Sequence, residues 1–455
     1  MSAALESMGA GAAQVASRRM AIAEGPGTRC FAFDGHGRIP LDTFLAEVRG
    51  VAAGLPDAAC AVNLCEDRYR FLVAFCAVAL RGQINLLPPS RTPAAIDDVR
   101  RQYPDSYCIS DVRLSPAPPR LHALSERLPK LDGPRPEVDA GALAMIGFTS
   151  GSTGTPAANP KTWGSLRRST AQDAAVLQHL WPADGATLPI VATVPPQHMY
   201  GMELSVLLPL LANAAVHGGR PFFPDDVARA LREAHGEALL VTTPVHLRAL
   251  VESGIDMPRP AGIVTATAPL PQALAAAAEQ RFGCEVRELF GSTETCVIAC
   301  RRTARDDLWQ LLPDVRLQPQ PDGTLVQAAH LATPVMLADL VELRPDGRFL
   351  LCGRQADLLE IAGKRASLGD LTRRLLAVPG VLDGVVLQLD PCEVTGVRRI
   401  AALAVAPGLD ETAILDALRQ SIDPLFLPRR LRLIDALPRN ETGKLPRASL
   451  LPLLR

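Results

Sequence analysis

Apolar runs alternate with amphipathic stretches along most of the chain. Residues 41–55, LDTFLAEVRGVAAGL, have apolar side chains at i, i+3 and i+4 spacing, which predicts a helix. A strand–helix–strand–helix–strand series follows later, predicted at 238–243, 244–253, 262–268, 271–283 (ending at Gly283) and 285–290. Such alternation predicts a layered α/β architecture.

The last hundred residues have a different order of elements. The pattern predicts helix, strand, strand, helix and strand at 367–378, 383–389, 399–405, 410–422 and 429–435. This order is self-contained, and a turn and a short strand precede it. We therefore expect a large layered N-terminal domain over 1–353 and a small α+β C-terminal domain over 354–455.

Composition narrows the class of protein. The 455 residues are 48% apolar, which supports more than one core, and the net charge of −1 without a basic block argues against nucleic acid as a partner. The ten cysteines are scattered, as in reduced cytoplasmic proteins. The longest apolar runs, 71–80 and 204–216, are too short to span a bilayer. No signal pattern opens the sequence. We expect a soluble, cytoplasmic protein.

One loop suggests phosphate chemistry. Residues 148–161 read FTSGSTGTPAANPK and follow the strand-like MIGF. Glycines allow tight curvature, and hydroxyls beside backbone N–H groups suit an oxyanion. The alternative is a flexible linker. The loop is not a Walker A motif, because Gly154 is followed by Thr155 and Pro156 instead of lysine and Ser/Thr.

Three further stretches carry polar side chains where ligands bind. LFGSTET (289–295) ends a predicted strand with an aromatic, hydroxyls and an acid. The segment 339–365 puts Asp339 and Arg354 on either side of a hairpin. LPRNETGKLPR (437–447) places Lys444 in a turn that contains glycine.

Together and in this order, these stretches resemble the adenylate-forming superfamily of acyl-CoA synthetases, aryl-acid ligases, luciferases and peptide-synthetase adenylation domains. TSGSTGTP matches its phosphate loop, TATAPLP and LFGSTET its adenine and Mg-ATP segments, GRQADLLEIAGKR its interdomain segment, and NETGKLPR its catalytic-lysine loop. The resemblance implies an α/β fold with a mobile small domain. It also implies ATP and Mg²⁺ as cofactors and a two-step reaction, in which a carboxylate forms an acyl-adenylate and a thiol then displaces AMP.

The resemblance also implies roles for particular residues. Lys444 would bridge the substrate carboxylate and the α-phosphate, Glu294 would bind the metal, and Thr153 would contact phosphate directly. The remaining phosphate-loop positions are Thr149, Ser150, Gly151, Ser152 and Gly154. Asp339 would accept hydrogen bonds from the ribose hydroxyls, and Arg354 would reach the ribose or a phosphate. The other nucleotide-binding positions are Thr267, Ala268, Pro269, Phe290, Gly291, Ser292 and Thr293. The acid pocket would include His198, Met199, Tyr200 and Gly201, and Gly363 would line the thiol channel. Alternatives are a core aromatic at Phe290, a core histidine at His198, and solvent-exposed Glu294 and Lys444.

Several positions depart from the family pattern. Ala157 replaces the usual lysine, and residues 157–160 resemble a local insertion that leaves Lys161 either assisting the phosphates or merely solvated. Leu337-Ala338 replaces a Thr-Gly pair, and Ala356, beside Asp357, occupies the usual hinge position. These departures keep open a non-catalytic adenylate-binding protein.

The substrate is indicated less directly. The amino-acid sequences of the motifs are similar to those of ligases from bacterial xanthomonadin and aryl-polyene pigment pathways. This resemblance implies transfer of an aryl acid such as 3-hydroxybenzoate to an acyl carrier protein. The alternative is an acyl- or aryl-CoA ligase. A basic patch for an acidic carrier protein has five candidates, which are also plausible as ordinary solvated charges: Arg373, Arg374, Arg429, Arg430 and Arg432.

Overall fold

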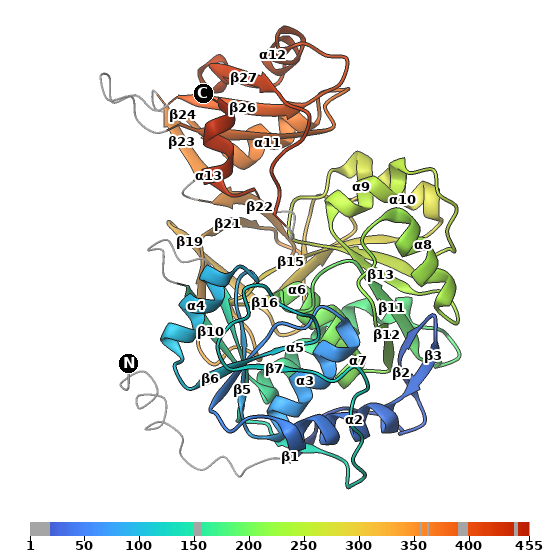
Figure 1. Ribbon diagram of the computed structural model, residues 1–455. Helices are drawn as coiled ribbons and strands as arrows, with labels where there is room; N and C mark the ends of the chain where they lie inside the picture. Colours follow the sequence, from blue (N-terminus) through green and yellow to red (C-terminus); the bar gives the residue numbers. More distant parts are fainter. Residues whose placement is uncertain are drawn as a thin grey trace. The chain divides into compact units, whose positions relative to one another are not determined.

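The computed structural model describes residues 19–149, 156–354, 357–361, 364–389, 399–440 and 445–454. By their internal contacts these residues fall into two compact units. Figure 1 labels helices and strands of both. Unit 1 comprises the described residues up to 241 together with 256–261 and 292–297, and unit 2 comprises the others. The domain boundary expected at 353/354 stays a prediction.

Unit 1 contains a six-stranded sheet that includes β9, the strand from which the predicted phosphate loop leaves. Its strand order is β10-β9-β5-β4-β6-β7, and all neighbours are parallel except β9 and β10. The strands are β4 (Cys60–Asn63), β5 (Ile84–Leu87), β6 (Ser106–Ser110), β7 (Leu121–Ala123), β9 (Leu143–Thr149) and β10 (Ala157–Thr162). On one face of this sheet, Ile96 and Val99 of α4 (Pro93–Gln102) pack into a core with Val62, Leu86 and Phe148.

A second run of strands in unit 1 has the order β13-β11-β12-β2-β3. These strands are parallel except for the hairpin of β2 and β3. Their bounds are β2 (Cys30–Asp34), β3 (Gly37–Pro40), β11 (Leu188–Ala192), β12 (Ala214–His217) and β13 (Leu239–Thr242). The other elements are β1 (Arg19–Ala21), β8 (Glu137–Asp139), α2 (Leu41–Gly54), α5 (Trp163–Leu177) and α8 (Pro224–Glu233).

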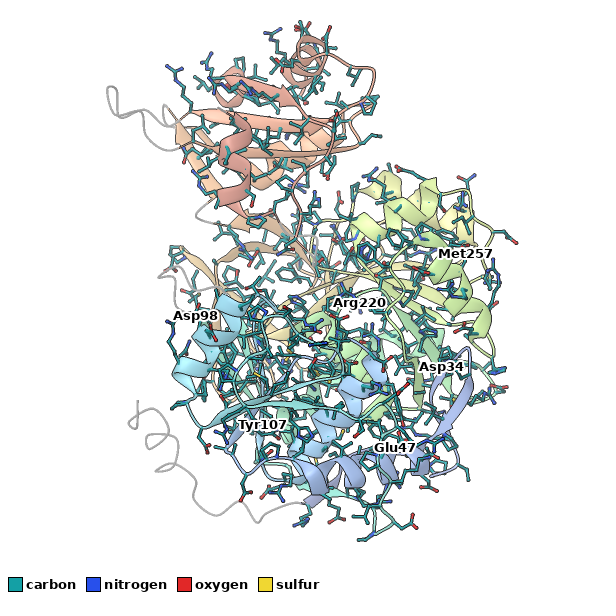
Figure 2. The ribbon with its side chains drawn as sticks, viewed as in Figure 1. Asp34, Glu47, Asp98, Tyr107, Arg220 and Met257 are labelled. Carbon is teal, nitrogen blue, oxygen red and sulfur yellow. The ribbon has the colours of Figure 1, made fainter. Side chains whose placement is uncertain are left out.

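The apolar run at 71–80 belongs to α3 (Arg68–Leu80), a helix that is buried on nearly every side. It contacts α2, β4, β5 and β12, so apolar side chains all around it are explained by packing within the unit. The Tyr107 hydroxyl of β6 (Figure 2) is buried in this region and donates to Gln83 Oε1 at 2.8 Å. Within the described part of the chain, no helix is both long and apolar enough to cross a membrane.

Unit 2 contains the rest of the predicted strand–helix series. The elements are α9 (Pro244–Glu252), β14 (Gly262–Thr265), α10 (Gln272–Phe282) and β15 (Val286–Ser292). β14 and β15 are parallel, and α10 ends at Gly283 in the left-handed region, with φ +63°. β16 (Cys296–Arg301) and β17 (Gln310–Leu311) are antiparallel. The predicted elements of this stretch are confirmed.

Three small antiparallel groups come next in unit 2. They are β18 (Arg316–Gln320), β19 (Gly323–Gln327) and β20 (Val335–Leu337); β21 (Asp339–Leu343) and β22 (Phe349–Arg354); and β23 (Leu358–Ile361) and β24 (Lys364–Ser367).

The C-terminal elements follow the predicted helix–strand–strand–helix–strand order. They are α11 (Leu368–Leu376), β25 (Asp383–Gln388), β26 (Ile400–Val405), α12 (Glu411–Arg419) and β27 (Arg430–Leu433), with the short α13 (Arg447–Leu450) after them. The buried side chains that pack α11 and α12 onto these strands all come from residues 359–431. The α/β class of the fold is therefore confirmed.

Candidate functional site

The predicted phosphate loop leaves β9 at Thr149, which is the last described residue before it. Ser150, Gly151, Ser152, Thr153 and Gly154 lie outside the described residues. The same holds for the hinge position Ala356, the thiol-channel Gly363 and the catalytic candidate Lys444. The roles implied for these residues stay predictions.

The metal candidate Glu294 lies in a tight turn next to Thr149. The Thr149 hydroxyl donates to Glu294 Oε1 at 3.3 Å, although the two residues are 145 positions apart. The turn closes on itself, because Ser292 N donates to Thr295 Oγ1 at 3.1 Å and Thr295 N donates to Ser292 Oγ at 3.2 Å. A Cβ at Gly147 of β9 would lie 3.0 Å from Thr293 Cγ2, so this strand and the turn approach each other closely.

Lys161 is buried and not solvated. Residues 157–161 pair one for one with β9, from Ala157 opposite Thr149 to Lys161 opposite Met145. The expectation of a local insertion relative to the family stays a prediction. Lys161 is 7% exposed, and its Nζ donates to the Glu294 backbone carbonyl at 2.6 Å.

These groups suit a magnesium ion that is bound together with ATP. Glu294 and Thr149 offer carboxylate and hydroxyl oxygens, the hard ligands that Mg²⁺ prefers. Across the described ranges, no three His, Cys, Asp or Glu side chains gather into a metal cage. A site with one carboxylate fits the usual binding of Mg²⁺ through substrate phosphates and water.

The predicted acid pocket forms the short helix α6 (Met199–Met202), with His198 at its N-cap. Met199 and Tyr200 are each 8% exposed. A Cβ at Gly201 would lie 2.0 Å from the Pro195 carbonyl oxygen, so only glycine fits at this position. A π-helical turn, η2 (Glu203–Leu207), follows directly and continues into α7 (Leu208–Leu211). Such turns are frequent at functional sites.

The ribose candidates pair in unit 2. Asp339 and Arg354 face each other across the β21–β22 ladder, and Arg354 Nε lies 3.2 Å from Asp339 Oδ1. The Thr324 hydroxyl donates to the Asp339 backbone carbonyl at 2.7 Å. Burial raises the pKa of nearby Asp357, while the Arg354 cation opposes the rise.

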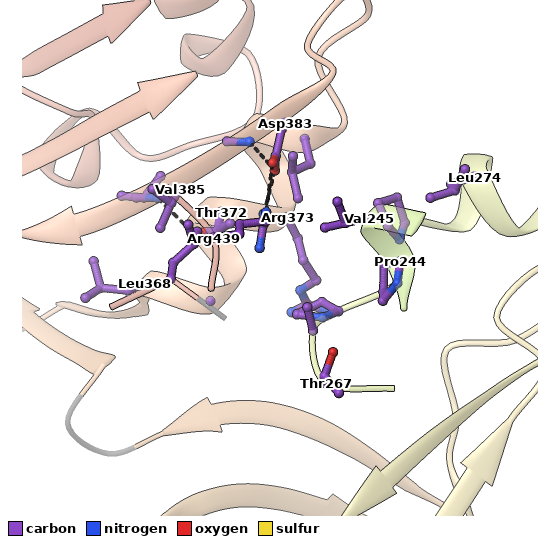
Figure 3. Close-up of a pocket in the computed structure, with 18 of the residues that line it drawn as sticks. Pro244, Val245, Thr267, Leu274, Leu368, Thr372, Arg373, Asp383, Val385 and Arg439 are labelled. Atoms are coloured by element: carbon purple, nitrogen blue, oxygen red, sulfur yellow. Dashed lines mark hydrogen bonds and ion pairs between the residues drawn. The ribbon is translucent and has the colours of Figure 1, made fainter. Parts of the chain in front are cut away.

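The adenine candidates Thr267, Ala268 and Pro269 line a cavity of about 480 Å³ in unit 2 (Figure 3). Arg354 and Asp357 also line it. Thr267 has φ +82° and a buried hydroxyl that has no hydrogen-bond partner among the described residues. Backbone strain at a β-branched residue and an unpaired hydroxyl are both typical of ligand sites.

Phe290 packs against other aromatic residues. Its ring centroid is 5.5 Å from that of Trp309 and 6.2 Å from that of Phe349. The side chain is partly exposed, as are Ser292 and Thr293, whereas Gly291 is exposed. Phe290 therefore belongs to a core cluster, and its contact with adenine stays a prediction.

Sequence reasoning missed a buried acidic pair in unit 1. Glu203 Oε1 accepts hydrogen bonds from Ser169 Oγ at 2.7 Å and from Val297 N at 3.0 Å. Asp173 is fully buried, and neither carboxylate oxygen has a partner among the described residues. Burial raises the pKa of Glu203 to about 7 and raises that of Asp173 well above its usual value, which the Glu203 charge reinforces. An acid inside the apolar run GMELSVLLPLL was the available signal.

A second missed group is Arg68 at the start of α3. It is fully buried and donates to Ser205 Oγ at 2.5 Å and to the carbonyls of Ala192 and Val194 at 2.8 Å. Burial lowers its pKa to about 9. Ser205 in turn donates to the Gly201 carbonyl at 2.6 Å, so Arg68 braces the turn that follows the predicted acid pocket.

Comparison with known proteins defines the class. The AMP-binding enzyme family matches residues 51–324, more than half of the chain. The chain belongs to this family and is an enzyme, an ATP-dependent, AMP-forming acid–thiol ligase. The non-catalytic alternative is therefore set aside.

Two relatives illustrate the similarity. The chain is 32% identical over 305 residues to a 4-coumarate–CoA ligase of Rhodobacter capsulatus, covering 65% of this chain and 73% of that protein. It is 27% identical over 399 residues to a sulfoacetate–CoA ligase of Cupriavidus necator, covering 75% and 72%. Among solved structures, an o-succinylbenzoate CoA synthetase from Bacillus subtilis matches with a TM-score of 0.79 at 17% identity over 95% and 98% of the two chains, which shows a shared fold.

Proposed function

We propose that this ligase activates an aryl carboxylic acid, such as a hydroxybenzoate, and transfers it to the phosphopantetheine thiol of an acyl carrier protein in the cytoplasm. Activation of the acid with ATP is supported above all by the contact of Thr149 with Glu294. This contact joins β9, which precedes the phosphate loop, to the predicted metal segment. Free cysteines throughout the described ranges agree with a reducing compartment.

In the first step a carboxylate oxygen attacks the α-phosphorus of ATP, the bond to pyrophosphate breaks, and an aryl-adenylate forms. Thr149 and the following loop hold the leaving phosphates, and Lys444 contacts both the attacking carboxylate and the α-phosphate. Asp339 accepts hydrogen bonds from the ribose hydroxyls, as a carboxylate with two oxygens can. Magnesium, held by Glu294, supplies positive charge to the phosphates when it is bound.

In the second step the thiol sulfur attacks the acyl carbonyl carbon, the thiol proton is released, and AMP leaves. Gly363 contributes to the channel that admits the thiol arm. The walls of the acid pocket come from His198, Met199, Tyr200 and Gly201. An aryl acid is supported by the relative named for 4-coumarate, an acid with an aromatic ring.

A carrier protein as acceptor is supported by two observations. A 137-residue match at 33% identity is to an L-proline–[L-prolyl-carrier protein] ligase of Pseudomonas fluorescens, covering 28% of this chain and 27% of that protein. All five basic-patch candidates are exposed, but neighbouring groups engage three of the guanidinium groups, which leaves Arg429 and Arg432 as the main candidates. Arg373 and Arg374 instead pair with Asp370, and Arg430 donates to the Leu454 carbonyl.

CoA is the second candidate acceptor, because relatives matched over most of their length are CoA ligases. The test is acid-dependent ATP–pyrophosphate exchange with a panel of benzoates, cinnamates and fatty acids, followed by product analysis with CoA or a holo carrier protein. The proposal predicts exchange with aryl acids and an acyl-loaded carrier protein. Exchange confined to fatty acids, or acyl-CoA as the sole thioester, would contradict it.

A further inference from the structure

Two buried side chains hold the turn that carries Glu294. Lys161, near the end of β10, donates from Nζ to the Glu294 backbone carbonyl at 2.6 Å. Glu203, the first residue of η2, accepts from Val297 N at 3.0 Å. They are 7% and 1% exposed. The turn is therefore anchored at residues 294 and 297 by side chains from two separate elements.

The turn needs such anchoring because its backbone is strained. Cys296 has φ +61°, which costs a residue with a Cβ on the order of 1–3 kcal/mol. A conformation of this kind persists only where its surroundings fix it. Removing the Glu203 acceptor would leave a buried Val297 N–H unpaired, and removing the Lys161 cation would leave the Glu294 carbonyl without this donor.

We propose that Lys161 and Glu203 are positioning residues that hold Glu294 where it binds Mg-ATP. The proposal rests on the metal role given to Glu294 under the proposed function. Lys161 contacts the Glu294 backbone, so the carboxylate itself stays available to Thr149 and to a metal ion. The two side chains fix the ligand without touching the substrate, as outer partners of metal ligands commonly do.

Asp173 provides a matched control. It is fully buried in unit 1 like Glu203, but neither of its oxygens accepts a hydrogen bond from the described residues, including the turn. Asp173→Asn therefore changes a buried acid of the same cluster without releasing the turn. Glu203→Gln is the conservative control, because the amide oxygen can still accept from Val297 N and Ser169 Oγ.

The experiment compares Lys161→Met, Glu203→Met, Glu203→Gln, Asp173→Asn and Glu294→Gln. Two quantities are measured: the Mg²⁺ concentration that gives half-maximal pyrophosphate exchange, and the affinity for ATP with saturating Mg²⁺ by titration calorimetry. Lys161→Met and Glu203→Met are expected to raise the half-maximal Mg²⁺ concentration about 10-fold and to weaken Mg-ATP binding. Glu203→Gln and Asp173→Asn are expected to stay within about 2-fold of the wild type on the same reasoning.

The outcomes separate the two claims. If Glu294→Gln raises the Mg²⁺ requirement but Lys161→Met and Glu203→Met lower only the melting temperature, the side chains are structural and the positioning proposal is wrong. If Glu294→Gln leaves the Mg²⁺ dependence unchanged, the metal role itself is wrong. Should Lys161→Met fail to fold, Lys161→Gln, whose side chain is one atom shorter, carries the same prediction.

Discussion

The turn at 292–297 in unit 1 and the β21–β22 hairpin in unit 2 both present a carboxylate, but they hold it differently. Glu294 lies in a turn anchored by Lys161 and Glu203, which are almost fully buried. Asp339 pairs with Arg354, whose side chain is 61% exposed. Water can replace an exposed partner, whereas a buried polar group left unpaired costs about 1–3 kcal/mol. Changes to the turn should therefore disturb both fold and ligand, and changes to the hairpin the ligand alone.

The largest effect is expected at Lys444, which belongs to neither region and acts on the reacting groups in the proposed function. Lys444→Ala should lower acid-dependent pyrophosphate exchange by about 10² to 10³, by analogy with loss of one preorganised donor. Thioester formation from supplied aryl-adenylate should be spared, because that step does not need the cation. Normal exchange in the variant would remove Lys444 from the mechanism.

An intermediate effect on activity is expected at Asp339, and this variant tests whether the hairpin is held less rigidly than the turn. Asp339→Asn should raise the KM for ATP about 10-fold with little change in kcat, because the ribose contact is equal in ground and transition states. The melting temperature should stay near that of the wild type, since partly exposed ion pairs contribute about 0–1 kcal/mol. Steady-state kinetics and a thermal melt give both values. A large loss of stability would show that the hairpin is held as rigidly as the turn.

The smallest effect on activity is expected at Asp173, where the change is instead a pH-dependent gain in stability. A carboxyl whose pKa is raised on folding binds its proton more tightly in the folded state, so stability falls as pH rises above the pKa of the unfolded chain. Asp173→Asn removes this penalty, by about 1.4 kcal/mol for each pKa unit of the shift. The variant should therefore melt above the wild type at pH 8 and close to it at pH 4. Equal differences at the two pH values would show that Asp173 does not titrate on folding.

Much of the fold was predictable because the apolar residues of the chain recur with the periods of the helices and strands that they form. The helix predicted at 41–55 is α2. The helix–strand–strand–helix–strand order predicted for the last hundred residues is found as α11, β25, β26, α12 and β27. The proline and small residues of 157–160 gave no strand signal, because such residues are typical of loops. The structure uses them in β10, at the edge of the six-stranded sheet, where Pro160 needs no ladder hydrogen bond.

The candidate site was predictable only where a motif names its residues. Motif resemblance identified Thr149 and Glu294, but not the partners that hold them. Lys161 was judged from the sequence by a spacing that did not fit the family. Its contact with the Glu294 carbonyl depends instead on the strand register that buries it. Glu203 and Val297 are 94 positions apart in sequence, and only tertiary packing brings them into contact.

The central claim is that the enzyme makes an aryl-adenylate from ATP and an aryl acid. The most direct measurement is mass spectrometry of a single turnover with ATP, Mg²⁺ and 3-hydroxybenzoate, without any thiol acceptor. The account predicts hydroxybenzoyl-adenylate bound to the wild-type enzyme with one equivalent of pyrophosphate released, and much slower formation of both products with Lys444→Ala. Release of ADP and phosphate, or no adenylate with any aryl acid despite ATP binding, would contradict it.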